Sequence, residues 1–246
     1  MKIIKNNDIN LSIIKSDIDN LDSDLKKIPF PLPPKSSGWL IVGSPGSGKT
    51  SMWTSLIMSK NQAYWMKFDK IYLISGSLAT LPEQLLKNLD PNQIFDEYHI
   101  ELIKEILNEE KESGENPNML LILDDVVKDI RAKNFNKIIL NRRHILQNPN
   151  NKKTQSGLTI FINSQSYNLL ELQCRKNLDH FVLFKSSNLK EIKSIKSELM
   201  SDLTDKEQND ILNFCWDEPY SFLFIKNNNP KHLKYFRKFD LIDFKN

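Results

Sequence analysis

Cysteine is scarce in this chain. Its 246 residues include only two, Cys174 and Cys215. Their separation fits neither the short spacings of zinc ligands nor the dense cysteine pattern of a small disulfide-stapled domain. The sequence therefore indicates a protein of a reducing compartment.

Long apolar runs and a strong excess of one charge are also missing. No segment is apolar over the length that a membrane-spanning helix requires, and residues 1–11 lack the apolar core of a secretory signal. The net charge is only +3, from 34 basic and 31 acidic residues. A chain-wide attraction to nucleic acid is thus excluded, and any contact with DNA must use local basic patches. We expect an intracellular protein without a membrane segment.

Glycine is the third scarce residue, with 7 in the chain, but three of them stand within residues 43–48. They belong to the stretch GSPGSGKT, residues 43–50, which fits the phosphate-binding loop pattern G-x-x-x-x-G-K-[ST] at every constrained position. The apolar run 39–42 before it predicts a buried strand, and residues 51–60 after it predict a helix. A strand, a glycine loop and a helix are the context in which this pattern forms a phosphate site.

Each part of this loop has a chemical task. Its glycines allow backbone angles that other residues avoid, so that successive N–H groups can point toward an anion, and the following helix adds its positive end. Lys49 is predicted to contact the β- and γ-phosphates of ATP, and the Thr50 hydroxyl to ligate Mg²⁺. The predicted nucleotide-binding residues are Gly43, Ser44, Pro45, Gly46, Ser47, Gly48, Lys49, Thr50 and Ser51.

Apolar strands and amphipathic helices alternate along the rest of the chain. The predicted strands are 69–75, 119–123, 158–162 and 180–184, followed by a hairpin of 221–225 and 235–239. The predicted helices are 82–89, 97–110, 135–145, 169–174, 189–200 and 205–216, the last with a capping box at Thr204 and Glu207. This order predicts an α/β fold with a mainly parallel central sheet, flanked by helices and ending in a C-terminal β-hairpin.

The domain organisation follows from the same pass. Residues 1–27 are compatible with an edge strand and a short helix, and the prolines of 29–34 form a stiff, extended connector. We expect residues 1–35 to be an N-terminal extension and residues 36–246 to be one ATPase domain of the phosphate-loop class. Nucleotide is then expected at the carboxyl ends of the parallel strands.

An acidic pair follows the strand 119–123. Chains with a phosphate loop commonly carry such an acid at the end of a strand, where it helps to hold Mg²⁺. We assign this role to Asp124, and to Asp125 the orientation or deprotonation of the attacking water. A solvated Asp-Asp turn is the alternative, which the upstream loop disfavours.

The strand 158–162 runs into Asn163, Ser164 and Gln165. If it neighbours the strand of Asp124, these amides emerge beside the γ-phosphate. Gln165 is then the preferred residue to position water or sense hydrolysis, with Asn163 second. Simple capping of the strand end remains an alternative.

Two arginines are candidates for a contact with the γ-phosphate of a neighbouring subunit, and the sequence leaves open which of them acts there. Arg143 lies in the Arg-Arg-His step at 142–144, and Arg175 precedes the strand 180–184. An arginine finger stabilises the charge of the transition state. The alternative for Arg143 is a basic helix end that complements the helix dipole. His144 has no partner in the sequence that would make it a metal ligand.

In this order, GSPGSGKT, LLILDD, RRH, NSQS and CRKNLD resemble the motifs of viral genome-packaging ATPases of the FtsK–HerA superfamily. The likeness is to the poxvirus-type enzymes of large eukaryotic DNA viruses, virophages and Maverick/Polinton-like elements, and it spans residues 29–184. It implies catalytic roles for Lys49, Asp125, Gln165, Arg143 and Arg175, and a metal site at Thr50 and Asp124.

The resemblance also implies the partners. It predicts an ATPase that needs ATP and Mg²⁺, assembles into a homo-oligomeric ring and moves double-stranded DNA, held by its phosphate backbone, into a capsid. A capsid or portal-vertex protein is then a partner, and the host cytoplasm, a viral factory or the virion is the location. A solvated loop is the favoured interpretation of residues 148–153, and a pore loop that holds DNA phosphates through Lys152 and Lys153 is the alternative.

Two other functions remain open from the sequence. A nucleotide or small-molecule kinase also begins with a strand, a phosphate loop and a helix, but no arginine-rich lid is evident. An ATP-binding assembly switch without motor activity would carry the same loop. A GTPase is disfavoured because no Asn-Lys-x-Asp guanine signature occurs.

Overall fold

The structure is a computed structural model, and it describes residues 28–33, 36–60, 62–148 and 156–244. The predicted strand and helix within residues 1–27, and the predicted DNA-contacting lysines 152 and 153, lie outside this part. Within it, no helix combines the length and the apolar character needed to span a membrane.

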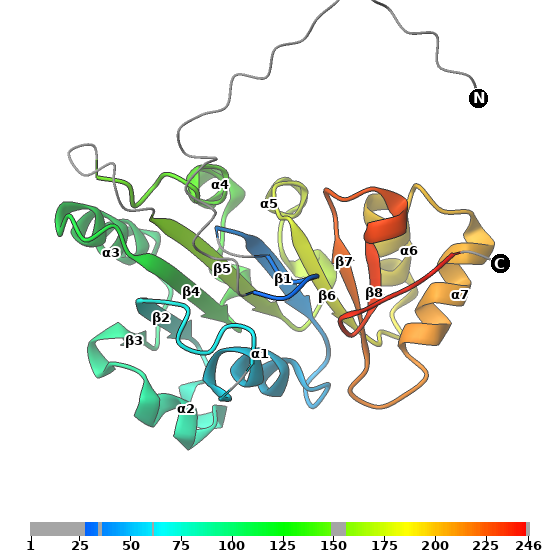
Figure 1. Cartoon of the computed structure of the whole chain (residues 1–246), viewed down its shortest axis with the longest axis horizontal. Helices are drawn as coiled ribbons and strands as arrows, with labels where there is room; N and C mark the ends of the chain where they lie inside the picture. The colour runs from blue at the N-terminus through cyan, green and yellow to red at the C-terminus, as the bar shows by residue number, and fades with distance from the viewer. Residues whose placement is uncertain (1–27, 34–35, 61, 149–155, 245–246) are drawn as a thin grey trace, which may run out of the picture.

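A single nine-stranded sheet organises the described part of the chain, in the order β3-β2-β4-β5-β1-β6-β7-β8-β9 (Figure 1). The strands are β1 (Gly38–Val42), β2 (Lys70–Ser75), β3 (Ile94–Phe95), β4 (Asn118–Asp124), β5 (Gly157–Ser164), β6 (His180–Phe184), β7 (Phe222–Lys226), β8 (Tyr235–Arg237) and β9 (Asp240–Leu241). Pairing is parallel from β3 to β6 and antiparallel from β6 to β9. The mainly parallel sheet and the C-terminal hairpin of β7 and β8 are both confirmed.

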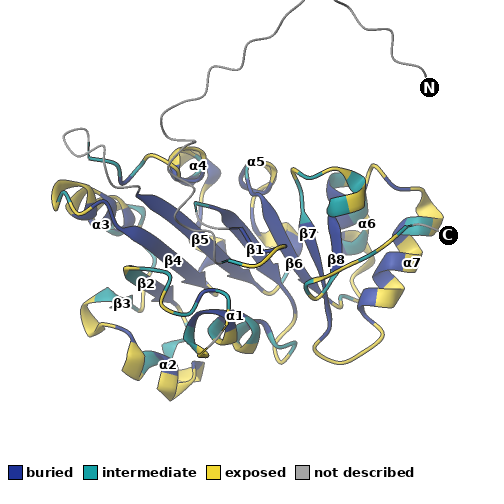
Figure 2. Ribbon diagram, in the orientation of Figure 1, coloured by how far each residue is buried: buried dark blue, intermediate teal, exposed yellow. Residues whose placement is uncertain are grey.

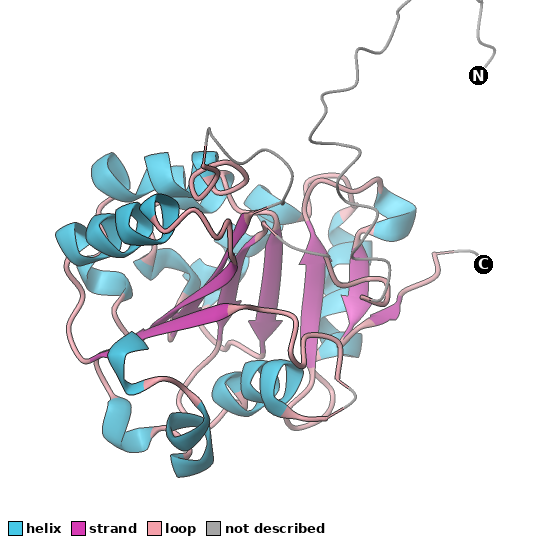
Figure 3. Cartoon of the chain, turned by 60° about the vertical axis from the view of Figure 1, so that its left-hand side comes forward, coloured by secondary structure: helices cyan, strands magenta, loops and turns pink. Residues whose placement is uncertain are grey.

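Helices cover both faces of this sheet (Figure 3). They are α1 (Lys49–Met58), α2 (Glu83–Asn88), α3 (Ile100–Glu112), α4 (Ala132–Asn141), α5 (Leu172–Lys176), α6 (Leu189–Leu199) and α7 (Asp205–Cys215). One apolar cluster packs α1 and α2 against one face of the sheet. A second cluster packs the helices from α3 through α7 against the other face. The central strands are therefore buried throughout, while the outer sides of the helices are exposed (Figure 2).

The sequence of β1 explains why it is a buried strand. Successive side chains point to opposite faces, so Trp39 and Ile41 pack in one cluster while Leu40 and Val42 pack in the other. A strand covered on both faces needs apolar residues at every position rather than an alternating pattern. The apolar run before the glycine loop has this property.

Some boundaries differ from the predictions. The helix expected at 135–145 begins at Ala132 and ends at Asn141, and β3 and β9 were not predicted. β3 and β9 contain two residues each, too few for any periodicity to be visible in a sequence. The capping box of α7 is confirmed, since the Glu207 amide donates to Thr204 Oγ1 and the Thr204 amide to Glu207 Oε2.

Candidate active site

The glycine loop lies between β1 and α1, at the edge where the parallel strands end. Its first amide, of Gly43, donates to the Ser164 carbonyl at the end of β5 over 3.1 Å. Gly46 and Gly48 have φ angles of 75° and 101°, a region that residues with a side chain rarely adopt. A Cβ on Gly43 would lie 2.4 Å from Ser47 Oγ. All three glycines are therefore required by the shape of the loop.

Lys49 begins α1, and its side chain turns back into the loop. Its Nζ donates to the carbonyl of Gly43 over 2.6 Å and to that of Ser44 over 3.2 Å. Burial lowers the pKa of Lys49, and the nearby charges of Asp125 and Asp124 act in the opposite direction. The ammonium is thus held at the mouth of the loop, within electrostatic reach of the acidic pair.

Asp124 ends β4 with a side chain fixed from both neighbouring strands. Its Oδ2 accepts a hydrogen bond of 3.0 Å from Ser75 Oγ on β2, and its Oδ1 one of 3.0 Å from Asn163 Nδ2 on β5. The residue is only 4% exposed, and this burial raises the pKa of its carboxyl. A carboxylate oriented by such donors is suited to hold a metal ion.

Asp125 and Gln165 meet beside this buried acid. Gln165 Nε2 donates to Asp125 Oδ1 over 3.3 Å, and Ser77 Oγ contacts Asp125 Oδ2 at 3.4 Å. Both contacts are exposed and long. Asp125 has a φ of 55°, in the left-handed region that non-glycine residues occupy at an energetic cost, often at functional sites.

The strand order explains why these groups come together. β5 lies between β4 and β1, with Asp124 opposite Asn163 and Val42 opposite Ser164. The condition set for Gln165, that its strand neighbours the strand of Asp124, is therefore met. It brings the glycine loop, the acidic pair and Gln165 to one edge of the sheet.

The predicted arginine at 143 lies at the opposite edge. The carbonyl of the preceding residue, Arg142, accepts from the amide of Leu158 near the start of β5. Arg143 itself is exposed. Within one chain it does not reach the glycine loop, and its action on a neighbouring subunit stays a prediction.

Arg142 is the buried member of that pair. Its Nη2 lies 2.6 Å from both carboxylate oxygens of Asp179, its Nε donates to the Ser36 carbonyl and its Nη1 to that of Ile139. Asp179 in turn accepts from the amide of Gly38 over 2.8 Å. This network joins the starts of β1 and β6 to the end of α4, which is a structural role.

Arg175 is also engaged within the chain. On α5, its Nη2 lies 2.7 Å from Glu198 Oε1 and its Nε 3.0 Å from Glu198 Oε2, while Nη1 donates to the Leu170 carbonyl. Its guanidinium also stacks 4.6 Å from the centre of the Tyr167 ring. A role at the site of another subunit stays a prediction, and it would require this ion pair to open.

Two residues of the site were missed at the level of sequence. Ser75 was not recognised because its contact with Asp124 depends on the pairing of β2 with β4. Glu191 on α6 is buried, and it accepts from the amide of Tyr167 and from Ser186 Oγ. Glu191 thereby connects the segment after Gln165 to the segment after β6. It also lines a pocket of about 240 Å³ that reaches Gly43 and Ser44.

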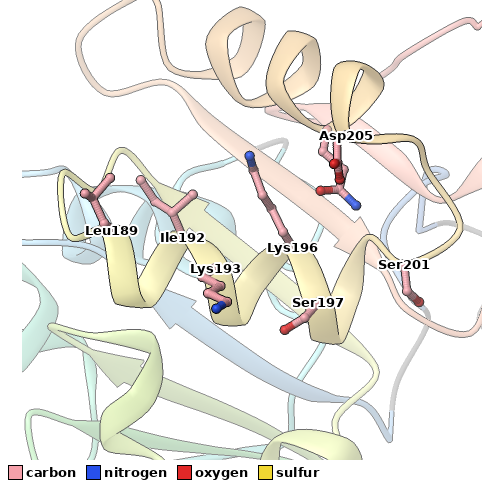
Figure 4. A pocket seen from close by; sticks show the side chains of 8 residues that line it. Leu189, Ile192, Lys193, Lys196, Ser197, Ser201 and Asp205 are labelled. Carbon is pink, nitrogen blue, oxygen red and sulfur yellow. The ribbon is translucent and has the colours of Figure 1, made fainter.

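A different pocket, of about 420 Å³, lies between α6 and α7 (Figure 4). Leu189, Ile192, Lys193, Lys196 and Ser197 line it from α6, and Asp205 from α7. Lys196 Nζ is tied to Asn209 Oδ1 over 2.6 Å. None of the predicted site residues contributes to this pocket.

The residues at the loop fit a nucleotide with a divalent metal. Among the described residues, no group of three or more His, Cys, Asp or Glu forms a ready metal site. Thr50 and Asp124 instead supply two oxygen donors, the ligand type that Mg²⁺ prefers when phosphate oxygens complete its coordination. The chemistry of these two residues thus fits the predicted metal site, and their role as ligands stays a prediction.

Known proteins share the fold of this chain. No curated protein sequence is significantly similar to the chain. The genome packaging NTPase B204 from Sulfolobus turreted icosahedral virus 2, in complex with AMPPCP, has a similar structure: 14% identity, a TM-score of 0.57, and coverage of 84% of this chain and 98% of that one. The DNA-packaging ATPase B204 from Sulfolobus Turreted Icosahedral Virus gives 16%, 0.55, 86% and 99%. These likenesses confirm the fold class.

The sequence match defines the family. Residues 32–215 match the family model described as Poxvirus A32 protein, which covers most of the chain and contains the glycine loop, the acidic pair and Gln165. The resemblance to poxvirus-type genome-packaging ATPases is therefore confirmed, and this protein belongs to the poxvirus A32 protein family.

Proposed function

We propose that this protein is an ATP-hydrolysing motor that translocates double-stranded DNA and packages a viral genome into a capsid. One observation carries the proposal. The glycine loop, the buried Asp124 and the exposed pair of Asp125 and Gln165 meet at one edge of the sheet, in a chain that belongs to the poxvirus A32 protein family.

The loop binds the triphosphate of ATP. Its backbone N–H groups and the N-terminus of α1 supply donors and a positive dipole end for the phosphate oxygens. The Nζ of Lys49 now donates to two carbonyls of its own loop, and it exchanges these partners for phosphate oxygens.

Thr50 and Asp124 would hold the magnesium ion. When bound, Mg²⁺ neutralises charge that develops on the phosphate oxygens during transfer. Ser75 and Asn163 keep the Asp124 carboxylate oriented by donating to both of its oxygens. Water is largely excluded from this carboxylate by its burial.

Asp125 and Gln165 act on the attacking water. Asp125 orients the water and accepts its proton, and Gln165 donates its N–H to the carboxylate and so holds it in place. The contact of 3.3 Å is long for a hydrogen bond, which suits a pair that shortens when ATP arrives. Gln165 thereby reports the state of the γ-phosphate to the segment that follows β5.

A ring of copies supplies the remaining charge. Arg143 is exposed, whereas Arg175 is buried and paired with Glu198. Arg143 is therefore the arginine that can contact the nucleotide of a neighbouring copy without opening an internal ion pair. The DNA is held by its phosphate backbone, without reading of bases. Because the net charge of the chain is small, this contact uses local basic patches.

The experiment is the ATPase rate of the full chain, measured with and without linear duplex DNA at several protein concentrations. A motor that works as a ring predicts a rate per subunit that rises with protein concentration and rises further with duplex DNA. Transfer of phosphate to a nucleoside but not to water would establish a kinase instead. ATP binding without turnover under all conditions would leave an assembly switch and overturn the proposal.

A further inference from the structure

The glycine loop opens onto two pockets, one of about 240 Å³ that also reaches Gln165 and a larger one. On the side of β4 and β5 stand Asp124, Asp125 and Gln165, which act on the γ-phosphate end. On the side of β6 and β7 lies a pocket of about 620 Å³ that shares Ser44, Gly46 and Ser47 with the loop. A triphosphate whose γ end faces the acids directs its nucleoside away from them, toward this second pocket.

Tyr220 is the most unusual residue of the second pocket. It lies in the segment between α7 and β7, and its side chain is 69% exposed although it is large and apolar. Its φ of 61° is in the left-handed region, where a bulky residue is a strong outlier. Such strain persists at sites that bind ligands more often than elsewhere.

The ring of Tyr220 stands directly against the loop. A Cβ built on Gly48 would lie 3.2 Å from Tyr220 Cδ1 and 3.6 Å from Phe184 Cε1. Gly48 immediately precedes Lys49, so the aromatic ring flanks the point where the phosphate chain must enter. Phe214, an exposed aromatic residue of α7, is instead covered by the guanidinium of Arg237 at 4.7 Å.

The floor of the pocket adds apolar and polar groups. Phe184 and Trp216 line it, and both are buried. Ser221 is 2% exposed, and its hydroxyl has no hydrogen-bond partner among the described residues. Asp217 and Glu218 stand at the rim, held by Arg237 at 2.6 and 3.1 Å. Aromatic faces with a few convergent polar groups are typical of a small-molecule site.

We propose that this pocket holds the nucleoside of ATP, with the base stacked on the Tyr220 ring and the rim carboxylates accepting hydrogen bonds from its amino or hydroxyl groups. The inference rests on the proposed function and deepens it. It makes Tyr220 the residue through which the protein distinguishes a nucleotide from a bare phosphate chain, since the glycine loop alone contacts only phosphates.

The test compares two ligands that share a phosphate chain. ATP and inorganic tripolyphosphate, each with Mg²⁺, are titrated calorimetrically into the full chain. Tyr220→Ala is expected to weaken ATP binding about tenfold or more, the usual worth of one base on an aromatic ring, while tripolyphosphate binding stays unchanged. Tyr220→Phe keeps the ring and should bind ATP like the wild type.

Two further variants make the result unambiguous. Tyr220→Gly removes the ring and also relieves the left-handed backbone, so it should fold at least as well as the wild type and show the same selective loss. Phe30→Ala removes an exposed aromatic at another surface and should change neither affinity. A wild type that binds both ligands, with ATP affinity unaltered in Tyr220→Ala, would overturn the inference alone. A wild type that binds neither ligand would overturn the proposed function as well.

Discussion

The parallel strands of the sheet begin at one edge, the amino edge, and end at the other, the carboxyl edge. Both edges carry charged residues, but these residues have different surroundings. At the amino edge, Arg142 and Asp179 are buried and bonded to each other and to backbone groups, with contacts from 2.6 to 2.9 Å. At the carboxyl edge, Asp125 meets Gln165 and Ser77 through exposed contacts of 3.3 and 3.4 Å. The short, buried hydrogen bonds of the amino edge stabilise the fold. The long, exposed contacts of the carboxyl edge leave donors and acceptors available to a substrate.

The comparison extends to the acids themselves. Asp179 lies beside a guanidinium, which compensates its charge. Among the described residues, the side chains that donate to Asp124 are neutral, and burial raises the pKa of its carboxyl. Its charge is compensated less fully than that of Asp179, because the Lys49 ammonium acts on it without a direct hydrogen bond. The carboxyl edge thus lowers the free energy of unfolding, and binding of metal and nucleotide offsets this loss.

The largest predicted effect comes from removing the cation of the carboxyl edge. Lys49→Ala should lower ATP turnover about 10³-fold, or about 4 kcal/mol, because a charge that acts on the transition state is lost. Its thermal unfolding midpoint should stay close to that of the wild type. Lys60→Ala, just beyond the other end of α1 and exposed, is the matched control and should retain full turnover.

At the amino edge the same kind of change should act on stability. Arg142→Ala leaves Asp179 buried without its ion pair, which should lower the free energy of unfolding by about 3 kcal/mol. Urea unfolding followed by fluorescence measures this. Arg143→Ala, one residue away but exposed, should change stability by less than about 0.5 kcal/mol. Equal effects of the two variants would show that the network is not structural.

Acid should weaken the amino edge through His180. This residue, paired with Trp39 across β1 and β6, is buried among aromatic rings, and burial lowers the pKa of its imidazole to about 3. The unfolded chain therefore binds a proton that the folded chain does not, and stability falls as the pH drops below about 6.5. Between pH 7 and pH 5 this loss should be about 2 kcal/mol.

Substitution isolates the contribution of that histidine. His180→Gln should flatten the dependence of unfolding free energy on pH over this interval, while the exposed His99→Gln should leave the slope unchanged. An unaltered slope in His180→Gln would assign the acid sensitivity to other groups.

The smallest effect concerns the contact between Gln165 and Asp125. Gln165→Ala should reduce ATP turnover about tenfold, because Asp125 loses the donor that orients it. Gln165→Glu should reduce it further, since two carboxylates would then face each other. Gln173→Ala, an exposed glutamine on α5, should have no effect. Pre-steady-state phosphate release distinguishes an effect on chemistry from one on product release.

The carboxyl edge could be predicted from the sequence because its information is local. The glycine loop is a contiguous pattern, and the acidic pair and Gln165 each follow an apolar strand. Their meeting needed only one assumption, that β4 and β5 are neighbours. Ser75 was missed because its partner is 49 residues away and the contact depends on a third strand.

The amino edge could not be predicted in the same way. Nothing near Arg142 in the sequence indicates Asp179, which is 37 residues away and comes close only when α4 and the start of β6 are in place. The same limit applies to Arg175, whose partner Glu198 is on α6, and to Glu191, whose partner is the backbone of Tyr167. The sequence therefore does not distinguish a buried, structural arginine from an exposed one, and the three-dimensional structure does.

The most direct test of the nucleotide site separates binding from chemistry at Asp125. For Asp125→Asn, ATP affinity is measured by calorimetry and hydrolysis by single-turnover assay, both with Mg²⁺. The site described here predicts ATP affinity within about threefold of wild type and hydrolysis slowed by 10²-fold or more, roughly the contribution of one general base. Hydrolysis at the wild-type rate would contradict it, because the water would then be activated elsewhere.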